Sequence, residues 1–432
     1  MHIQIRNFGP VKAFDFDLKK DFVVIFGKNN LGKSYAISAV YLVLKNLLNL
    51  KTDKMSRKNV LRQLRDYFLN DALMTERDEK AISVILFPLI QTLLEEIEES
   101  FYNTFDGMDK IINPHSQEIP SVTIKQDQGE LTMAVQEQKL VLQNFCPPLA
   151  EIDKAQNLDD NRYDELDRLL NKALFFLHDD ETGKTETSLI FLPASRSGLY
   201  QGLNTFSQIM VELSKSRRFA TKKFELLSIS EPYSDYFLGL SNLQPQKLNP
   251  DNPILSIVNE IEKTILKGEV IFDEVTKKMF YKPHQTDLVL DVSATSSMVS
   301  ELSPIVCYLK YKVAFTNAQS ILFIEEPEAH LHPETQVQLM AIFAKLVKAN
   351  VKIVITSHSD YMFNKLNNLI LEGQIDIASI QATVIKESHQ GSIAKEVPID
   401  KLGIDDENFL EIAEDIFNEK LSLIEKLNDE GT

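Results

Sequence analysis

The sequence predicts an α/β fold in which a largely parallel sheet carries helices on both faces. Strands buried on both faces are continuous hydrophobic runs, and four such runs occupy residues 22–26, 188–192, 321–324 and 351–355. Apolar residues at helical spacing follow the first three runs. Buried strands that alternate with helices are typical of parallel sheets, which bind ligands at the carboxyl ends of their strands.

The composition is that of an ordinary globular chain with an acidic balance. There are 432 residues, 44% of them hydrophobic, and the net charge is -17. The length predicts about two or three domains, and the charge excludes a pervasively basic surface for nucleic acid. Two cysteines are too few for a disulfide framework. Since neither a membrane-spanning run nor a secretory signal is visible, we expect a cytoplasmic protein without a membrane segment.

The remaining elements follow from periodicity and turn residues. Two short strands flank a Gly9-Pro10 turn, and a helix is expected from Tyr35 to Leu48. Further helices are expected within residues 49–112, 158–177, 199–267, 298–315, 335–347 and 406–427. Alternating stretches predict a hairpin over residues 120–145 and strands over 269–281 and 287–292.

The sharpest motif is a glycine-rich loop between the first buried strand and the first long helix. It fits the phosphate-loop pattern G-x-x-x-x-G-K-[ST], in which backbone N–H groups surround phosphate oxygens. Lys33 is expected to reach the β- and γ-phosphates of ATP, and Ser34 to bind Mg²⁺. The predicted nucleotide-binding residues are Gly27, Lys28, Asn29, Asn30, Leu31, Gly32, Lys33, Ser34 and Tyr35.

Two further motifs follow buried strands. The run ILFI ends in Glu325 and Glu326, which we expect to hold Mg²⁺ through water and to deprotonate the attacking water, respectively. His358 follows the next strand in TSHS and is expected to donate a hydrogen bond to the γ-phosphate. Lys33, Glu326 and His358 are therefore the predicted catalytic residues.

Other candidates allow two interpretations each. Ser296 and Ser297 open a helix and either contact an anion or simply cap the helix. Arg196 either senses phosphate or a partner's glutamate, or forms a structural salt bridge. His330 and His332 shape a proline-flanked turn rather than hold zinc, for which no third ligand is evident. A basic cluster over residues 215–223 is a solvated helix face or a contact for DNA.

In their order along the chain, these motifs resemble the ABC-type ATPase heads of the RecF, SMC and OLD-like group of P-loop ATPases. The resemblance is carried by GKNNLGKS, SSMVSEL, ILFIEEPEAHLHP and ITSHS. It implies an ABC-ATPase-like P-loop head made of residues 1–45, 185–210 and 268–400. Residues 46–184 then form a helical insertion with a β-hairpin, residues 211–267 a helical lobe, and residues 401–432 an acidic C-terminal helix.

The resemblance also implies a dimer or larger oligomer with composite ATP sites. The loop, Glu325, Glu326 and His358 act in one subunit, and Ser296 or Ser297 contacts the nucleotide from the other. Two departures bear on this. Glu325 stands where many relatives have aspartate, and Met298 where glycine is common.

Three functions are consistent with the motifs. The first is an ATPase switch for a separately encoded effector protein, commonly in phage defence, because little chain follows His358 and no second catalytic domain is visible. The second is a RecF-like DNA-repair ATPase, which the acidic charge disfavours. The third is a nucleotide-binding scaffold that does not hydrolyse ATP.

Overall fold

A computed structural model describes residues 1–52, 60, 62–63, 79–126, 129–146, 187–202, 229–245, 251–316, 318–400 and 403–404. The helices expected over 158–177 and 406–427 and the basic cluster over 215–223 lie outside the described residues.

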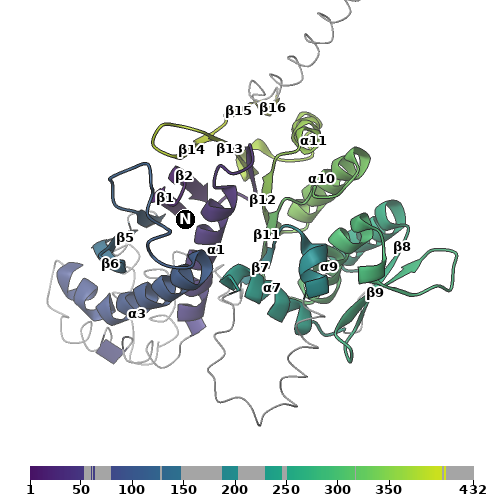
Figure 1. The fold of residues 1–432 in the computed structure, drawn as a ribbon, viewed down its shortest axis with the longest axis horizontal. Helices are drawn as coiled ribbons and strands as arrows, with labels where there is room; N and C mark the ends of the chain where they lie inside the picture. The colour runs from purple at the N-terminus through teal and green to yellow at the C-terminus, as the bar shows by residue number, and fades with distance from the viewer. Residues whose placement is uncertain are drawn as a thin grey trace, which may run out of the picture.

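The fold is built on a mixed sheet (Figure 1), which confirms the predicted α/β class. Its strand order is β6-β5-β4-β1-β2-β14-β13-β3-β12-β11-β7, and the segment from β13 to β7 is parallel throughout. The bounds are β1 (His2–Phe8), β2 (Val11–Asp17), β3 (Phe22–Gly27), β4 (Ser121–Gln126), β5 (Gly129–Gln136), β6 (Lys139–Cys146), β7 (Ser188–Leu192), β11 (Ser320–Glu325), β12 (Val351–Ser357), β13 (Ile380–Lys386) and β14 (Ser392–Glu396).

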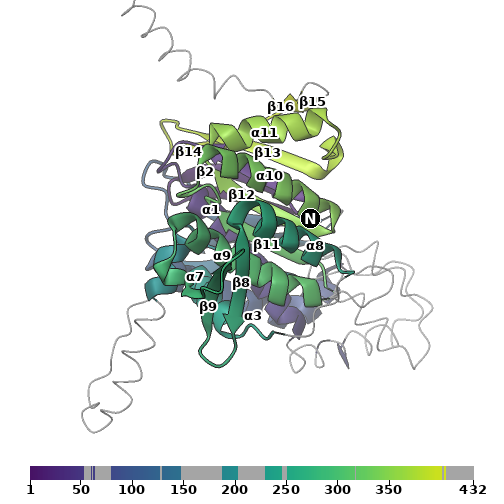
Figure 2. The same cartoon turned by 90° about the vertical axis from the view of Figure 1, so that its right-hand side faces the viewer.

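Helices cover both faces of this sheet (Figures 1 and 2). One face carries α1 (Lys33–Thr52) and α3 (Glu79–Phe105). The other carries α7 (Glu231–Ser241), α8 (Pro253–Glu260), α9 (Ser297–Tyr311), α10 (Pro333–Lys348) and α11 (Asp360–Leu371). In the part of the chain that the structure describes, every helix is too short or too polar to cross a lipid bilayer.

The central strands are uniformly apolar because both of their faces are buried. In β3, Phe22, Val24 and Phe26 join the hydrophobic core beneath α9 to α11. Val23 and Ile25 join the core beneath α1 and α3 instead. Successive side chains of a strand point to opposite faces, so a single apolar run supplies both cores and leaves only the strand ends for polar chemistry.

The sheet differs from the prediction beyond β5. The hairpin expected over residues 120–145 consists of three strands, β4, β5 and β6, which extend the main sheet through β4 and β1. The turn from β5 to β6 has φ values of 48° at Glu137 and 62° at Gln138. Two-residue hairpin turns with two positive φ angles usually contain Asn or Gly, so this turn carries none of the usual sequence signal.

Smaller elements complete the fold. A three-stranded sheet, formed by β8 (Gly268–Asp273), β9 (Lys278–Pro283) and β10 (Leu290–Asp291), packs against α9. The strands expected over residues 269–281 are confirmed as β8 and β9, whereas only Leu290–Asp291 of the expected stretch 287–292 are a strand, because a 3-10 turn begins at Val292. A π-helical turn, Ile261–Leu266, follows α8, and a two-stranded ladder joins Ile399–Asp400 to Gly403–Ile404.

A buried arginine joins the edge of the main sheet to helix α9. Arg196 follows β7 and is 0% exposed. Its guanidinium donates to the carbonyl oxygens of Pro193 at 2.9 Å, Glu301 at 3.1 Å and Glu325 at 2.9 Å. It also lies 3.5 Å from the Glu301 carboxylate. Of its two predicted roles, the structure supports the salt bridge, because the guanidinium is enclosed and already bonded.

We predict that Arg196→Met lowers the free energy of unfolding by about 3–5 kcal/mol, because the Glu301 carboxylate stays buried without its counter-charge. Urea denaturation measures the loss. The matched control is Arg6→Met, because Arg6 pairs with Asp15 at 2.7 Å on the surface, where an ion pair contributes about 1 kcal/mol or less. Equal losses in both variants would contradict the structural role of Arg196.

Candidate functional site

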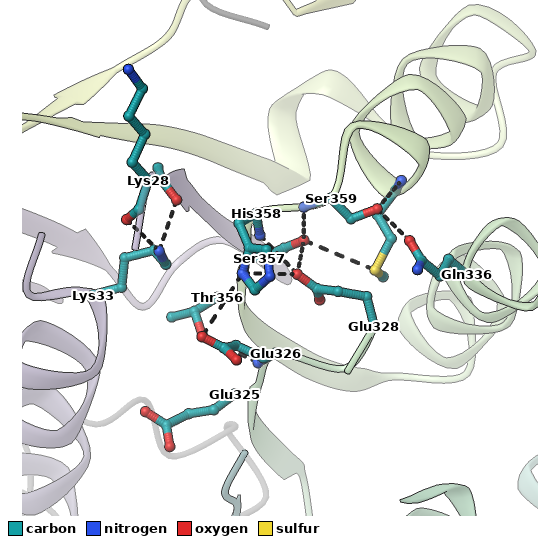
Figure 3. A network of polar contacts seen from close by, with 12 residues as sticks. Lys28, Lys33, Glu325, Glu326, Glu328, Gln336, Thr356, Ser357, His358 and Ser359 are labelled. Carbon is teal, nitrogen blue, oxygen red and sulfur yellow. Dashed lines mark hydrogen bonds and ion pairs between the residues drawn. The ribbon is translucent and has the colours of Figure 1, made fainter. Parts of the chain in front are cut away.

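Three strand ends meet at one edge of the sheet and bring the sequence motifs together (Figure 3). The neighbours are β3, β12 and β11, which run parallel, so their carboxyl ends lie side by side. β3 leads into the loop over residues 27–34, β12 leads into His358, and β11 ends at Glu325. Segments that are far apart in sequence thus form one polar cluster.

The glycine-rich loop depends on glycine at two positions. Gly27 has a φ of 151°, and a Cβ added there would lie 2.8 Å from the carbonyl oxygen of Ile385. Gly32 has a φ of 85°, and a Cβ there would lie 2.7 Å from Val11. The exposed residues Lys28, Asn29 and Asn30 form the crest of the loop.

Lys33 and Tyr35 anchor the loop in different ways. The Lys33 ammonium donates to the carbonyl oxygens of Gly27 at 2.7 Å and Lys28 at 2.8 Å. Burial lowers the pKa of Lys33, and the nearby charges of Glu326 and Glu328 oppose that shift. Tyr35 turns its ring against Phe105, with centroids 4.8 Å apart, so it packs beneath the loop rather than facing the cluster.

Glu325 is a buried carboxylate with one unused oxygen. The side chain is 3% exposed, its Oε2 accepts from the Ala194 N–H at 3.5 Å, and Oε1 has no hydrogen-bond partner. Burial raises the pKa of Glu325, whereas the neighbouring hydroxyl of Ser34 lowers it. A carboxylate oxygen beside a hydroxyl suits Mg²⁺, which takes oxygen ligands and is usually held by one or two carboxylates and phosphate. These residues therefore fit the expected ion.

Glu326 is held in an unusual backbone conformation. Its φ is 41°, a value that residues other than glycine adopt mainly at functional or constrained positions. Its N–H donates to the carbonyl oxygen of Thr356 at 3.0 Å, and its own carbonyl accepts from Arg196 at 3.4 Å. The side chain remains 34% exposed and points into the space between the loop and His358 (Figure 3).

Glu328 is a site residue to which sequence reasoning assigned no role. It is 4% exposed, and its Oε1 accepts from the Ser357 hydroxyl at 2.8 Å and the His358 N–H at 2.7 Å. The His358 Nδ1 lies 3.5 Å from the same oxygen and 3.8 Å from Glu326. The only sequence signal is a third acidic residue two positions after the pair, which a surface loop would also show.

The helix-opening serines lie apart from this cluster. The Ser296 hydroxyl caps α9 by accepting from the Val299 N–H at 3.4 Å, and the side chains of Ser296 and Ser297 are exposed. Within the described residues, no hydrogen bond joins either serine to the loop. The Sδ of Met298 lies 3.8 Å from the Thr335 hydroxyl and fills space beside α10.

The two histidines after Glu328 have structural places. The Nδ1 of His332 accepts from the Glu334 N–H at 3.3 Å and caps α10. His330 occupies a turn with a φ of 60°. Across the ranges that the structure describes, no three His, Cys, Asp or Glu side chains converge as a metal-binding group.

Comparisons with known proteins identify the family of the chain. The sequence model of the AAA ATPase domain family matches residues 1–363. Among curated proteins, none matches this chain.

The similar solved structures are distant. An Smc head bound to the C-winged helix domain of ScpA gives a TM-score of 0.43 at 12% identity, covering 93% of this chain and 98% of that chain. An Smc head with an extended coiled coil, bound to the C-terminal domain of ScpA from Pyrococcus furiosus, gives 0.42 at 12%, covering 97% and 98%. The SMC head domain from Thermotoga maritima gives 0.38 at 9%, covering 92% and 98%. Because the family match spans most of the sequence, the chain belongs to the AAA ATPase domain family.

Proposed function

We propose that this ATPase is a switch that binds ATP with Mg²⁺, hydrolyses it in composite sites between two copies of the chain, and controls a separate effector protein. The observation that carries the proposal is the meeting of the loop, Glu325, Glu326 and His358 at three adjacent strand ends. This combination supplies groups for phosphate, metal and water at one place.

Phosphate binding falls to the loop and Lys33. The N–H groups of the loop and of the first turn of α1 can donate to phosphate oxygens, as helix N-termini do. The Lys33 ammonium donates to two carbonyls of its own loop. In the proposed complex it exchanges them for the β- and γ-phosphates, which also provide its buried charge with a counter-charge.

Metal binding falls to the Ser34 hydroxyl and the Glu325 carboxylate. Mg²⁺ bound there supplies charge neutralisation for the phosphates of ATP. Without a cation, Glu325 keeps a buried oxygen that accepts no hydrogen bond. A water between this carboxylate and the ion would extend the reach of Glu325, since Mg²⁺ usually retains several waters.

Hydrolysis is assigned to Glu326 and His358. Glu326 accepts a proton from the attacking water. Its backbone N–H donates to Thr356 and its carbonyl oxygen accepts from Arg196, and these two hydrogen bonds fix the backbone from which the carboxylate extends. His358 donates to the γ-phosphate. Glu328 positions His358 by accepting its backbone N–H, and Ser357 adds a second bond to the same carboxylate.

Dimerisation is assigned to the exposed start of α9. Ser296 and Ser297 present hydroxyls at a helix N-terminus and make no bond to the loop of their own copy within the described residues. A second copy can therefore supply them to the nucleotide. Stand-alone ATPases that the sequence resembles act with separately encoded effectors, often in phage defence, and we extend that role to this chain.

We predict that Glu326→Gln binds ATP but releases phosphate at least about 100-fold more slowly, because loss of a general base costs that much or more. The unhydrolysed nucleotide should then hold the protein as a dimer, measured as molar mass by light scattering with and without ATP. Lys33→Ala is the control and should neither bind ATP nor dimerise.

The same Glu326→Gln protein tests the effector. As bait in a pull-down from the native host, it should retain one protein in stoichiometric amount when ATP is present and none when ATP is left out. Lys33→Ala as bait should not retain that protein under either condition. Normal hydrolysis by Glu326→Gln would show that the base is another residue. Recovery of nuclease-sensitive DNA alone would favour the RecF-like function.

We predict that Glu328→Ala lowers kcat about tenfold or more while KM for ATP changes little, because the histidine loses its support but the loop is intact. Glu328→Gln should keep most of the activity, since an amide oxygen still accepts from Ser357 and His358. Steady-state phosphate release gives both constants. A rise in KM alone would instead place Glu328 in ATP binding.

We predict that Glu325→Gln raises the melting temperature of the metal-free protein near neutral pH. Burial raises the pKa of Glu325. As the pH rises through that pKa, the buried carboxyl ionises and the free energy of unfolding falls. A neutral amide does not ionise, so the variant avoids this loss. The gain should shrink in acid, where the carboxyl is protonated anyway. The variant should also lose the additional stabilisation by Mg²⁺ with ATP.

The control for that experiment is Glu334→Gln, which neutralises an exposed carboxylate at the start of α10. It should leave both the pH profile and the effect of Mg²⁺ unchanged. A drop in melting temperature for Glu325→Gln across the whole pH range would contradict the account.

A further inference from the structure

A large cavity lies beside the outer edge of the sheet, away from the loop over residues 27–34. Its volume is about 990 Å³, at the upper end of the range for small-molecule sites. It is bounded by β7, the last strand in the sheet order, by α1 and α7, and by the C-terminal end of α9. None of the predicted catalytic or nucleotide-binding residues lines it.

Aromatic rings form much of the cavity wall. Tyr41, Tyr308, Tyr311 and Phe315 line it. The Tyr41 hydroxyl donates to Asp235 at 2.8 Å, and the Tyr308 hydroxyl donates to the carbonyl oxygen of Tyr236 at 2.8 Å. Since these two hydroxyls are already used, both residues offer a ligand mainly the faces and edges of rigid rings.

The two lysines of the cavity differ in their partners. Lys45 lies 2.6 Å from both Glu231 and Asp235, so its charge is balanced. Lys312 is partly buried, yet no carboxylate of the described residues comes within ion-pair distance of its ammonium. The ammonium instead lies over the Tyr308 ring, 5.9 Å from the ring centroid.

An unbalanced cation in such a place is costly. Burial lowers the pKa of Lys312, and the more distant charge of Asp235 only partly opposes this. Removing a charge from water is unfavourable unless an opposite charge or hydrogen bonds compensate. A bound anion would supply that compensation next to the aromatic rings of the cavity.

We propose that this cavity binds a small organic anion that carries an aromatic ring, with the acidic group on Lys312 and the ring among the tyrosines. Asn242, Gln244 and Thr316 also line the cavity and can donate hydrogen bonds to the acidic group. Binding of this ligand does not depend on the proposed hydrolysis, because the two sites share no residue.

The cavity borders the elements that carry the ATPase site. The rings of Phe191 and Tyr41 pack on Phe323, with centroids 6.4 Å and 5.7 Å away. Phe323 lies on β11, two residues before Glu325. Tyr308, Tyr311 and Lys312 end the helix that Ser297 begins. A ligand in this cavity would thus touch elements that support the ATPase site, not the residues of the site itself.

The test is binding of naphthalene-2-sulfonate, an aromatic anion, measured by isothermal titration calorimetry on the full chain. Lys312→Gln should weaken binding at least about tenfold, as expected when a charge-assisted hydrogen bond is lost, and Lys312→Arg should restore it. The matched control is Lys348→Gln, which removes an exposed lysine in the last turn of α10 and should bind like the wild type.

Two further probes separate charge from shape. 2-Naphthylmethylammonium, of similar size but opposite charge, and methanesulfonate, an anion without a ring, should each bind at least about tenfold more weakly than naphthalene-2-sulfonate. Lys33→Ala should bind naphthalene-2-sulfonate normally, which keeps this result separate from the proposed ATP site even if hydrolysis fails.

Several outcomes would overturn the proposal: no binding at millimolar probe, equal affinity for Lys312→Gln, or equal affinity for the cationic analogue. Thermal melting checks that the variants fold. Lys312→Gln should melt at or above the wild-type temperature, because the substitution breaks no ion pair and removes a partly buried charge.

Discussion

The arrangement of the candidate site depends on one buried cation. Arg196 has no access to solvent, so its guanidinium must be satisfied by the protein alone. Carbonyl oxygens of three separate segments meet this need, at Pro193, Glu301 and Glu325, and the Glu301 carboxylate supplies the counter-charge. The end of β7, the second turn of α9 and the end of β11 are thereby held at fixed separations.

The second constraint is the register of the parallel strands. Glu325 pairs with Thr356 across β11 and β12, and Thr356 pairs with Ile25 across β12 and β3. A shift by one residue would turn every side chain of a strand to the opposite face, so side chains that fit one close-packed core would have to fit the other. The same apolar packing that stabilises the sheet therefore sets how far Glu326 lies from the loop and from His358.

The buried strands and the phosphate-binding loop could be predicted from the sequence, for physical reasons. The apolar runs predicted the buried strands because strands enclosed on both faces leave no alternation, and the loop pattern is specific because glycine alone tolerates the φ values at Gly27 and Gly32. The role of Glu328, the third strand β6 and the full burial of Arg196 could not be predicted from the sequence. Arg196 is buried by segments more than 100 residues away, and Glu328 binds residues 29 and 30 positions away at the end of the next strand. Strand β6 follows a turn, at Glu137 and Gln138, without characteristic residues.

Helix α9 links three features that the sequence presents as unrelated. Ser297 starts it, Glu301 binds Arg196 one turn later, and Lys312 follows its last residue. Fifteen residues at 1.5 Å each make a rod of about 22 Å. Because Arg196 also binds the carbonyl oxygen of Glu325, the helix that ends beside Lys312 is tied to the acidic loop. In the proposed switch, one helix thus connects the cavity, the magnesium carboxylate and the surface offered to a second copy.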